Sequence, residues 1–269
     1  EVRIGSGAAK TVTSNASGAW SVTLAGADIP ADATGVAVEA RTVDSFGNSS
    51  GWTSKLVDID TTPPAAPVIT TPIAIDNIIN ATEKAAGVTI SGTAPASTAM
   101  EVRIGGGTAK TVTSDSSGAW SATFVSTDIP ADATGVAVEA RTKDALGNTS
   151  AWVTKLVDID TVVPNNPAVV GQIAGNDIIN ATEKTNVNGV DVSVSAPGSA
   201  KVEVKIGSVI KTAILDAAGA GKANFTTAEI PADGTNIPVE GRSYDAAGNA
   251  SAWTQMKTVT IDTVLGAST

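Results

Sequence analysis

The sequence contains no cysteine and no histidine, and its 269 residues include only one tyrosine and three phenylalanines. Disulfide bonds, thiol nucleophiles and imidazole bases are therefore excluded, together with the usual zinc, copper and haem sites. Basic residues are also scarce, because 17 Lys and Arg stand against 27 Asp and Glu and give a net charge of −10. An acidic surface repels phosphate backbones, so we expect no nucleic-acid partner.

Long hydrophobic runs are missing as well. No apolar stretch approaches the roughly 20 residues that a membrane helix needs, so we expect no membrane insertion. The sequence opens directly on the alternating strand pattern Glu1–Ile4, without a signal-like segment. We expect an excised, monomeric piece of a longer chain.

What the sequence does contain is a repeat. Residues 1–60 return at residues 101–160 with 44 of 60 positions identical, and a more divergent third copy follows. The segment INATEK at Ile79–Lys84 recurs in the same way at Ile179–Lys184. An offset of 100 residues fits one small domain per copy. The repeat predicts a partial domain at 1–60 that lacks its first strands, and complete domains at 61–160 and 161–269.

The junctions between copies are short and contain proline, in the sequences TTPP at 61–64 and TVVP at 161–164. Proline restricts the backbone, so these junctions differ from flexible Gly/Ser tethers. We therefore expect the domains to form an extended rod.

Within the middle copy, hydrophobic and polar residues alternate, and turn residues recur about every 8 to 12 positions. This pattern, without a convincing helix, predicts an all-β fold, a seven-strand immunoglobulin-like β-sandwich. The expected strands are 68–73, 88–92, 100–104, 109–113, 119–125, 136–143 and 152–160. Alternation turns Glu101 and Arg103 outward, and Glu139 and Arg141 likewise. If the two strands are neighbours, crosswise ion pairs of about 0.2–1 kcal/mol each are expected.

Tryptophan occurs in two sets of corresponding strands, Trp20 with Trp120, and Trp52 with Trp152 and Trp253. Packing in the core or between strands is the ordinary role of such residues, and we favour it. Stacking of an exposed tryptophan on a sugar is the alternative.

The strongest chemical pattern lies at the end of each copy, where LVDIDT at 56–61 recurs at 156–161. Alternation places the two carboxylates of such a DxD pair on one face of the strand, about 7 Å apart. The DxxGN turn at 44–48, 144–148 and 245–249 is expected at the other end of the sandwich. The turn of one domain would then face the DxD pair of the domain before it.

Oxygen ligands without cysteine or histidine select calcium over transition metals. The predicted sites are Asp58, Asp60 and Asp144 at the first junction, and Asp158, Asp160 and Asp245 at the second. DxxGN is also a plain turn signature, since Asp, Gly and Asn suit turns for backbone reasons. The last copy has Thr260 in place of the first aspartate, so a site at that end is expected to be weaker or missing.

A further candidate is the loop between the first two strands. It offers calcium an oxygen-ligand set of Asp76, Asn80 and Glu83, and its copy offers Asp177, Asn180 and Glu183. The alternative is that Asn80 or Thr82 caps a short helical turn with Glu83 in its first turn. The sequence leaves both open.

The INATEK segment, the run EARTKDALGNTSAW and the junction VDIDTTPP together resemble the bacterial immunoglobulin-like repeats of giant non-fimbrial adhesins exported by type I secretion. The giant Salmonella adhesin is the nearest likeness, and biofilm-associated and ice-adhesion proteins are similar. The resemblance covers both complete copies and the partial one. It implies surface-displayed rods that calcium stiffens at the domain junctions, and it supports both junction sets of aspartates as ligands.

These observations predict a secreted or cell-surface stalk fragment whose partners are the neighbouring repeats of the same chain. The alternative is a binding module that contacts host-cell glycans or a receptor through a loop or an exposed tryptophan. No GxSxG elbow or phosphate loop stands apart from the repeat, so we expect no enzyme. The missing cysteine also suits export of an unfolded chain, whose acidic junctions close when calcium outside the cell draws them together.

Overall fold

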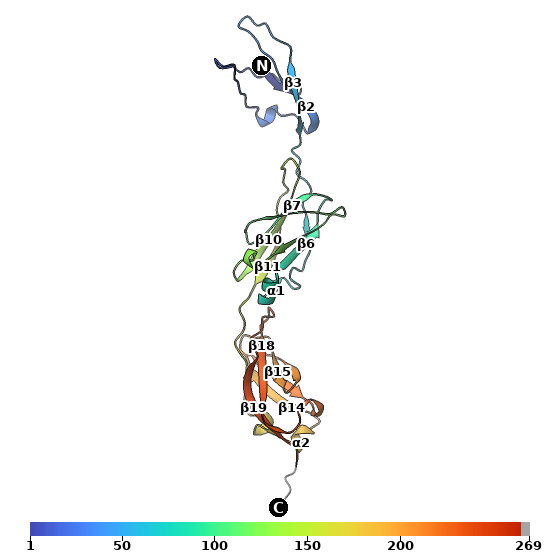
Figure 1. The fold of residues 1–269 in the computed structure, drawn as a ribbon, viewed down its shortest axis with the longest axis vertical. Helices are drawn as coiled ribbons and strands as arrows, with labels where there is room; N and C mark the ends of the chain where they lie inside the picture. The colour runs from blue at the N-terminus through green and yellow to red at the C-terminus, as the bar shows by residue number, and fades with distance from the viewer. Residues whose placement is uncertain (265–269) are drawn as a thin grey trace, which may run out of the picture.

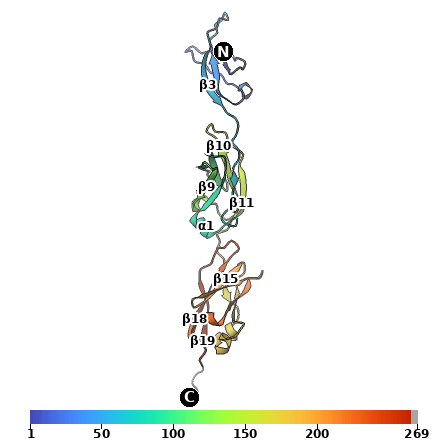
Figure 2. The same ribbon diagram turned by 90° about the vertical axis from the view of Figure 1, so that its right-hand side faces the viewer.

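In the computed structural model, which describes residues 1–264, three units follow one another along a line (Figure 1). A view turned by 90° keeps this line (Figure 2), so the molecule is rod-like from both sides. No helix within residues 1–264 is both long and apolar enough to cross a membrane.

The middle unit is a sandwich of two sheets. One sheet has the order β4-β6-β9, formed by Val68–Ile69, Val88–Thr93 and Ala119–Phe124. The other has the order β5-β11-β10-β7-β8, formed by Ile78–Ile79, Val153–Ile159, Ala133–Lys143, Ala99–Ile104 and Lys110–Thr113. The predicted immunoglobulin-like β-sandwich is confirmed, with its first strand divided between the two sheets.

The division of the first strand has a local cause. β4 ends at Ile69, and Pro72 has no N–H to donate to a ladder. Ala74, Ile75 and Asn77 have φ angles of 49°, 71° and 68°, which carry the chain across to the other sheet. There β5 runs parallel to β11. The expectation of one strand over 68–73 is therefore wrong.

The short helical turn that the sequence left open after Asn80 is present. Helix α1 (Ala81–Ala86) follows β5 after one residue, and helix α2 (Ala181–Lys184) occupies the same place in the third unit. Six residues are too few to show a helical hydrophobic period, so only the capping residues could predict this element.

The third unit repeats the arrangement of the second. Its smaller sheet is β12-β14-β17, at Ala168–Val169, Val190–Ser195 and Ala220–Phe225. Its larger sheet is β13-β19-β18-β15-β16, at Ile178–Asn180, Thr254–Asp262, Gly234–Tyr244, Lys201–Ile206 and Val209–Ile214. Short 3₁₀ turns are η2 (Ser126–Asp128), η3 (Ile173–Gly175) and η4 (Thr227–Glu229).

Each complete unit has a separate core between its two sheets. The core of the middle unit is built from residues between Ile69 and Ile159, and that of the third from residues between Ile173 and Ile261. Phe124 and Phe225 are the largest fully buried side chains, and most of the others are Ile and Val. Each such side chain contributes about 1.5–3 kcal/mol on burial, so the low aromatic content is sufficient for two small cores.

The outer face of the larger sheet carries the predicted ion pairs. β7 and β10 are antiparallel, with Arg103 opposite Glu139 and Arg141 opposite Glu101. The two pairs have N to O distances of 2.7 and 2.6 Å, which confirms the crosswise pairing. Both pairs are partly exposed, so the expected contribution stays at about 0.2–1 kcal/mol each.

The first unit is a single sheet with the order β1-β2-β3, at Val2–Ile4, Ala33–Ala40 and Thr53–Ile59, with a 3₁₀ turn η1 at Gly26–Asp28. Residues 19–24, the counterparts of β9, form no strand. In the middle unit β9 pairs with β6, and the described part of the first unit has no counterpart of β6. Trp20 is consequently 51% exposed, whereas Trp120 is 4% exposed.

Candidate functional site at the junctions between units

The DxxGN turn is closed by its own aspartate. Asp144 Oδ1 accepts hydrogen bonds from the backbone N–H groups of Leu146, Gly147 and Asn148 at 3.0, 2.7 and 2.8 Å. Its Oδ2 accepts from the side-chain amide of Asn148 at 2.7 Å. That side-chain bond, followed by the backbone bonds, holds the pKa of the Asp144 carboxyl below its ordinary value. The turn signature accounts for this local geometry, and its effect is to fix the orientation of Asn148.

From this position Asn148 contacts the preceding unit. Its Nδ2 donates to the backbone carbonyl of Asp60 at 2.9 Å. At the second junction Asn249 Nδ2 donates to the backbone carbonyl of Asp160, also at 2.9 Å. The turn of each complete unit therefore contacts the DxD segment of the unit before it, through a backbone carbonyl.

The second junction has two more contacts because a helix lies there. Asn80 caps α1, since its Oδ1 accepts from the Glu83 N–H at 3.0 Å while Glu83 Oε2 accepts from the Asn80 N–H at 3.1 Å. The predicted cap is thus present. The same end of the helix then meets the third unit: Asn80 Nδ2 donates to the Ala247 carbonyl at 3.1 Å, and the Ala81 N–H donates to Asn249 Oδ1 at 2.8 Å.

Asn249 is the centre of this junction. One oxygen accepts from the helix and one nitrogen donates to the end of the strand, so a single amide joins two separate segments of the middle unit. Asn249 is only 2% exposed. A buried amide with both groups paired contributes to stability, and removal of the side chain leaves two partly buried backbone groups without this partner.

The linkers are held from both sides. Asp32 accepts from the N–H and hydroxyl of Thr61 at 2.9 and 2.7 Å, and Asp132 accepts in the same way from Thr161. On the other side, the buried Thr142 hydroxyl donates to the Ala65 carbonyl at 2.9 Å. In the third unit the Ser243 hydroxyl donates to the Asn165 carbonyl. The linker backbone is therefore attached to the unit before it and to the unit after it.

These hydrogen bonds lower the pKa values of the linker aspartates. The backbone N–H and hydroxyl of Thr161 hold the pKa of the Asp132 carboxyl below its ordinary value, and Thr263 does the same for Asp233. The hydroxyls of Thr62 and Thr61 lower the pKa of Asp32. Each of these carboxyl groups therefore stays charged down to a lower pH than the carboxyl group of a free aspartate does. Its hydrogen bonds to the linker persist over the same pH range.

The predicted calcium ligands of the junctions lie as follows. Asp58 and Asp158 each accept the N–H of a glycine, Gly35 and Gly135, at 2.8 Å, at the bulge of the neighbouring strand. Asp60 and Asp160 accept the N–H groups of Thr62 and Val162 at 3.0 and 3.1 Å. Asp245 closes its turn through Asn249, as Asp144 does through Asn148.

No three acidic side chains within residues 1–264 lie close enough together to hold a metal ion. The sets Asp58, Asp60 and Asp144, and Asp158, Asp160 and Asp245, therefore do not form three-carboxylate clusters, although the turn and the DxD segment do meet. In the other candidate loop, Asp76 accepts the Ile78 N–H, while Asn80 with Glu83, and Asn180 with Glu183, are engaged as capping boxes. Asp177 pairs with Lys257 at 2.8 Å. A calcium role for these residues stays a prediction.

Trp120 and Trp152 are packed within the second unit, whereas Trp20 is 51% exposed. Trp120 is buried in the core. The Trp152 ring is covered by the guanidinium groups of Arg103 and Arg141, at 4.2 and 4.6 Å from the ring centre. Such cation–π contacts contribute about 0.5–1 kcal/mol at exposed sites. The same pair of arginines that forms the ion pairs therefore also covers this ring.

Two sets of junction residues were not predicted from the sequence. Asn148 and Asn249 were expected only as members of the DxxGN turn, and no role was expected for Asp32, Asp132 and Asp233, the aspartates of the IPAD segments at 29–32, 129–132 and 230–233. A signal was present for the second set, because an aspartate of the IPAD segment recurs in every copy with a threonine 29 or 30 positions later. Contacts of the asparagines depend on how whole units meet, which the local sequence does not show.

No protein-family model matches the chain, and no curated protein matches it. Among solved structures, the chain is similar to a calcium-stabilised adhesin that helps an Antarctic bacterium reach out and bind ice, with 29% identity and a TM-score of 0.50. That match covers 97% of this chain and 64% of the other, so the chain spans less than two thirds of that structure.

Two further similarities are with ice-binding adhesins. A 1.5-MDa bacterial ice-binding adhesin, studied for its retention on the host cell surface, is 24% identical over 98% of this chain and 86% of the other, with a TM-score of 0.44. A bacterial immunoglobulin-like domain from the M. primoryensis ice-binding adhesin is 30% identical over 37% of this chain and 100% of that domain, with a TM-score of 0.30.

Proposed function

We propose that the chain is an extender segment of a bacterial surface adhesin, in which immunoglobulin-like units are held end to end so that a distal adhesive tip stands away from the cell. The observation that carries the proposal is the contact of the DxxGN turns of the second and third units with the DxD segment of the unit before each. The partners of a unit are in this view its neighbours in the same chain.

An extender needs stiff junctions, because a flexible linker shortens the average distance that a chain of given length spans. The linkers here are attached on both sides, by Asp32 or Asp132 to the preceding unit and by Thr142 or Ser243 to the following one. Such attachment restricts both bending at the linker and rotation of one unit about the next.

Calcium is the proposed second component of the junction. The donors available there are hard oxygens: the Asp60 and Asp144 carboxylates at the first junction, the Asp160 and Asp245 carboxylates at the second, and nearby carbonyls. This donor set fits calcium, which takes oxygen ligands in flexible geometry. A bound ion would supply charge neutralisation and bonds to both units at once. The protein's own part is to bring the turn to the DxD segment.

The cellular setting follows from the same proposal. The similar solved structures include a calcium-stabilised adhesin that helps an Antarctic bacterium reach out and bind ice. We place this chain at the bacterial cell surface or among secreted proteins, exported by a type I system, which suits a sequence without cysteine. We assign it no catalytic activity.

Small-angle scattering in millimolar calcium and in EDTA tests the proposal. The expected result is an extended particle in calcium, roughly 100 Å long for three sandwiches with strands of this length, and a broader range of shapes in EDTA. A compact particle in both buffers contradicts the extender. An extended particle with identical profiles contradicts the calcium component alone.

Variants assign the effect to a junction. Asp58→Ala with Asp60→Ala should reproduce the EDTA profile at the first junction only, and Asp158→Ala with Asp160→Ala at the second only. If neither double variant changes the profile in calcium, these aspartates are not the ligands.

A further inference from the structure

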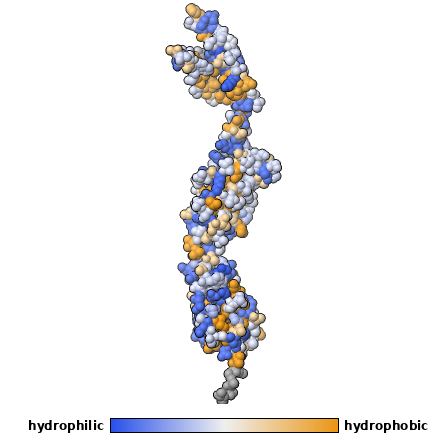
Figure 3. Space-filling view, in the orientation of Figure 1, coloured by the Kyte–Doolittle hydropathy of each residue, from blue (hydrophilic) through white to orange (hydrophobic). Residues whose placement is uncertain are grey.

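The two complete units are built from strands that resemble each other, although each unit has its own core. Figure 3 shows the units as successive bodies along the chain, with a narrow connection between the first and the second. Before the chain folds, a strand of one unit and its counterpart in the next are held at high local concentration, because one chain contains both. Tandem units with similar strands are therefore at risk of pairing across units.

Most inward-facing pairs of the smaller sheet do not distinguish the two units. Val88 lies opposite Phe124 in the β6–β9 ladder, and Val190 lies opposite Phe225 in the β14–β17 ladder. At the next inward position an alanine faces an isoleucine in one unit and a valine in the other. An exchange of strands between units would leave the packing at these two positions almost unchanged.

The third inward pair is reversed between the units. In the second unit Gly92 of β6 lies opposite Trp120 of β9, and in the third Val194 of β14 lies opposite Gly221 of β17. Trp120 and Val194 are both buried, at 4% and 1% exposure. The side chain that fills this layer of the core therefore comes from the later strand in one unit and from the earlier strand in the other.

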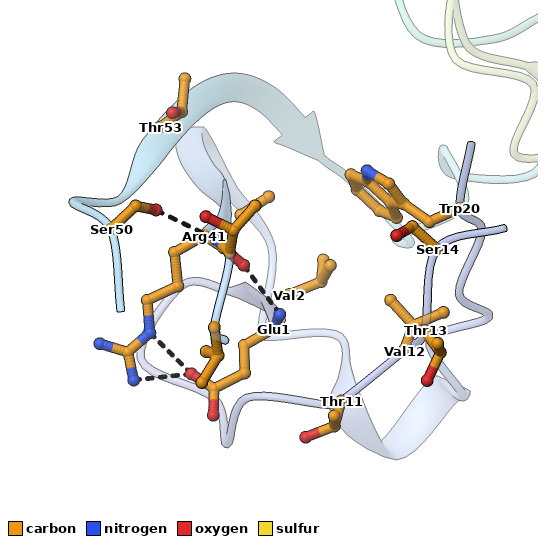
Figure 4. A pocket seen from close by; sticks show the side chains of 13 residues that line it. Glu1, Val2, Thr11, Val12, Thr13, Ser14, Trp20, Arg41, Ser50 and Thr53 are labelled. Atoms are coloured by element: carbon orange, nitrogen blue, oxygen red, sulfur yellow. Dashed lines mark hydrogen bonds and ion pairs between the residues drawn. The ribbon is translucent and has the colours of Figure 1, made fainter. Parts of the chain in front are cut away.

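A further position changes together with this pair. Ser114 is buried in the second unit, and its counterpart Leu215 packs against the core of the third. A Cβ added at Gly221 would be 2.8 Å from Leu215 Cδ2, so the leucine occupies the space beside this glycine. In the first unit the serine again accompanies the tryptophan, and Figure 4 shows Ser14 beside Trp20. Serine thus occurs with tryptophan, and leucine with glycine.

Pairing across units would fail in both directions. If β14 paired with β9, Val194 would take the place of Gly92. A Cβ at that place would lie 2.8 Å from the Trp120 ring and 1.8 Å from the Val68 carbonyl, so the valine would overlap both. If β6 paired with β17, two glycines would face each other, and the space that the valine fills in the third unit would be empty.

The outer faces of the same strands carry a weaker difference. Asp191 and Lys222 form an ion pair at 3.1 Å in the third unit, where the second unit has Thr89 and Ser121. Both side chains of the ion pair are exposed, so the pair contributes little to the choice between strands. The buried positions therefore supply the main difference between correct and incorrect pairing.

We propose that these buried positions form a pairing code, which makes each strand of the smaller sheet pair within its own unit and reject the corresponding strand of the adjacent unit. The code is Gly92, Ser114 and Trp120 in the second unit, and Val194, Leu215 and Gly221 in the third. It acts while the tandem chain folds. It depends neither on calcium nor on adhesion.

A pair of engineered cysteines reports pairing across units in the whole chain, which has no native cysteine. Ser121→Cys on β9 and Ser193→Cys on β14 lie in different units, and they would face each other only if β14 paired with β9. The chain is unfolded in urea, refolded by dilution at low concentration, and oxidised once refolding is complete. Mass spectrometry of peptides from the monomer then gives the fraction that carries the disulfide between positions 121 and 193.

Val194→Gly removes the overlap with the tryptophan, and we expect it to raise the disulfide fraction about fivefold or more. Two control variants weaken the same strand but keep the overlap. Val194→Ala retains the Cβ, and Val192→Gly removes a fully buried side chain while Val194 stays in place. Neither control should raise the fraction above that of the parent chain.

An equal rise in Val194→Gly and Val192→Gly overturns the proposal, because loss of stability alone then releases the strand. No rise in any variant overturns it too, because other differences between the units then keep the strands apart. A rise in Val194→Ala as large as that in Val194→Gly shows that a Cβ is tolerated beside the tryptophan, and this result also contradicts the code.

Discussion

The same turn occurs three times in this chain, and its asparagine has three different surroundings. Asn48 is exposed and bonds only within its turn, Asn148 is half-buried and reaches one carbonyl of the preceding unit, and Asn249 is 2% exposed and bonds two segments of the preceding unit. The turn sequence barely changes, so the preceding unit determines what the turn can contact. A junction is therefore a property of two units.

The first and second junctions differ in one element of the preceding unit. The second has α1, and the residues at the start of this helix, Asn80 and Ala81, make two of the three hydrogen bonds that join the turn of the third unit to the second unit. The described part of the first unit has no such helix, and one bond remains. We infer that the INATEK segment is the docking surface that a unit offers to the next one.

The largest expected effect comes from Asn249→Ala. This change leaves the Ala81 N–H and the Asp160 carbonyl without their partner, at a cost of about 1–3 kcal/mol in docking of the third unit on the second. Exchange of the Ala81 amide should speed up accordingly. The matched control is Asn48→Ala, which loses the same bond within the turn but contacts no other unit among residues 1–264. Equal Ala81 exchange in both variants would show that the amide does not join the units.

Asn80→Ala is expected to have the next largest effect. It removes the cap of α1, which costs about 0.5–2 kcal/mol, and also the bond to the Ala247 carbonyl. Asn180→Ala is the control, because Asn180 caps α2 in the same way but is exposed. Thermal unfolding should show similar losses for the two variants. Exchange of amides in residues 245–249 should increase in Asn80→Ala only, and an increase in both variants contradicts the assigned contact.

Asn148→Ala is expected to have a smaller effect. The bond to the carbonyl of Asp60, an exposed residue, is lost together with the bond to Asp144 within the turn, and the bond across the junction is worth about 0.5–1.5 kcal/mol. Spin labels at Ser54→Cys and Thr111→Cys, both exposed positions, report the first junction. In Asn148→Ala, the distance distribution between these two labels should broaden. The broadening should be smaller than that caused by Asn249→Ala between labels placed across the second junction. The opposite order would contradict the role given to α1.

The smallest effect is a pH dependence of the linker contacts. Bonds from Thr161 lower the pKa of Asp132 in the folded protein, so the contact is fully formed above the ordinary pKa of an aspartate and is lost as pH falls through the lowered value. The amide proton shift of Thr161 should follow this titration below about pH 4. Asp132→Asn should abolish the titration. A midpoint at or above the ordinary aspartate value contradicts the lowered pKa.

The sequence predicted those features that depend on local alternation. The crosswise pairing of Arg103 with Glu139 needed only the period of two and neighbouring strands, and it is confirmed. The bond from Ala81 to Asn249 joins residues 168 positions apart, and it depends on how two folded units meet. The exposure of Trp20 beside the burial of Trp120 had no local signal, since the flanking residues are nearly the same.

Docking of the Asn249 turn is expected to hold the third unit in one orientation on the second. The most direct test is the distance distribution between spin labels at Thr154→Cys and Thr212→Cys, two exposed positions on either side of the second junction in a chain without native cysteine. We predict one narrow distance in calcium, which broadens in Asn249→Ala. A broad distribution in calcium, unchanged by Asn249→Ala, would contradict the claim.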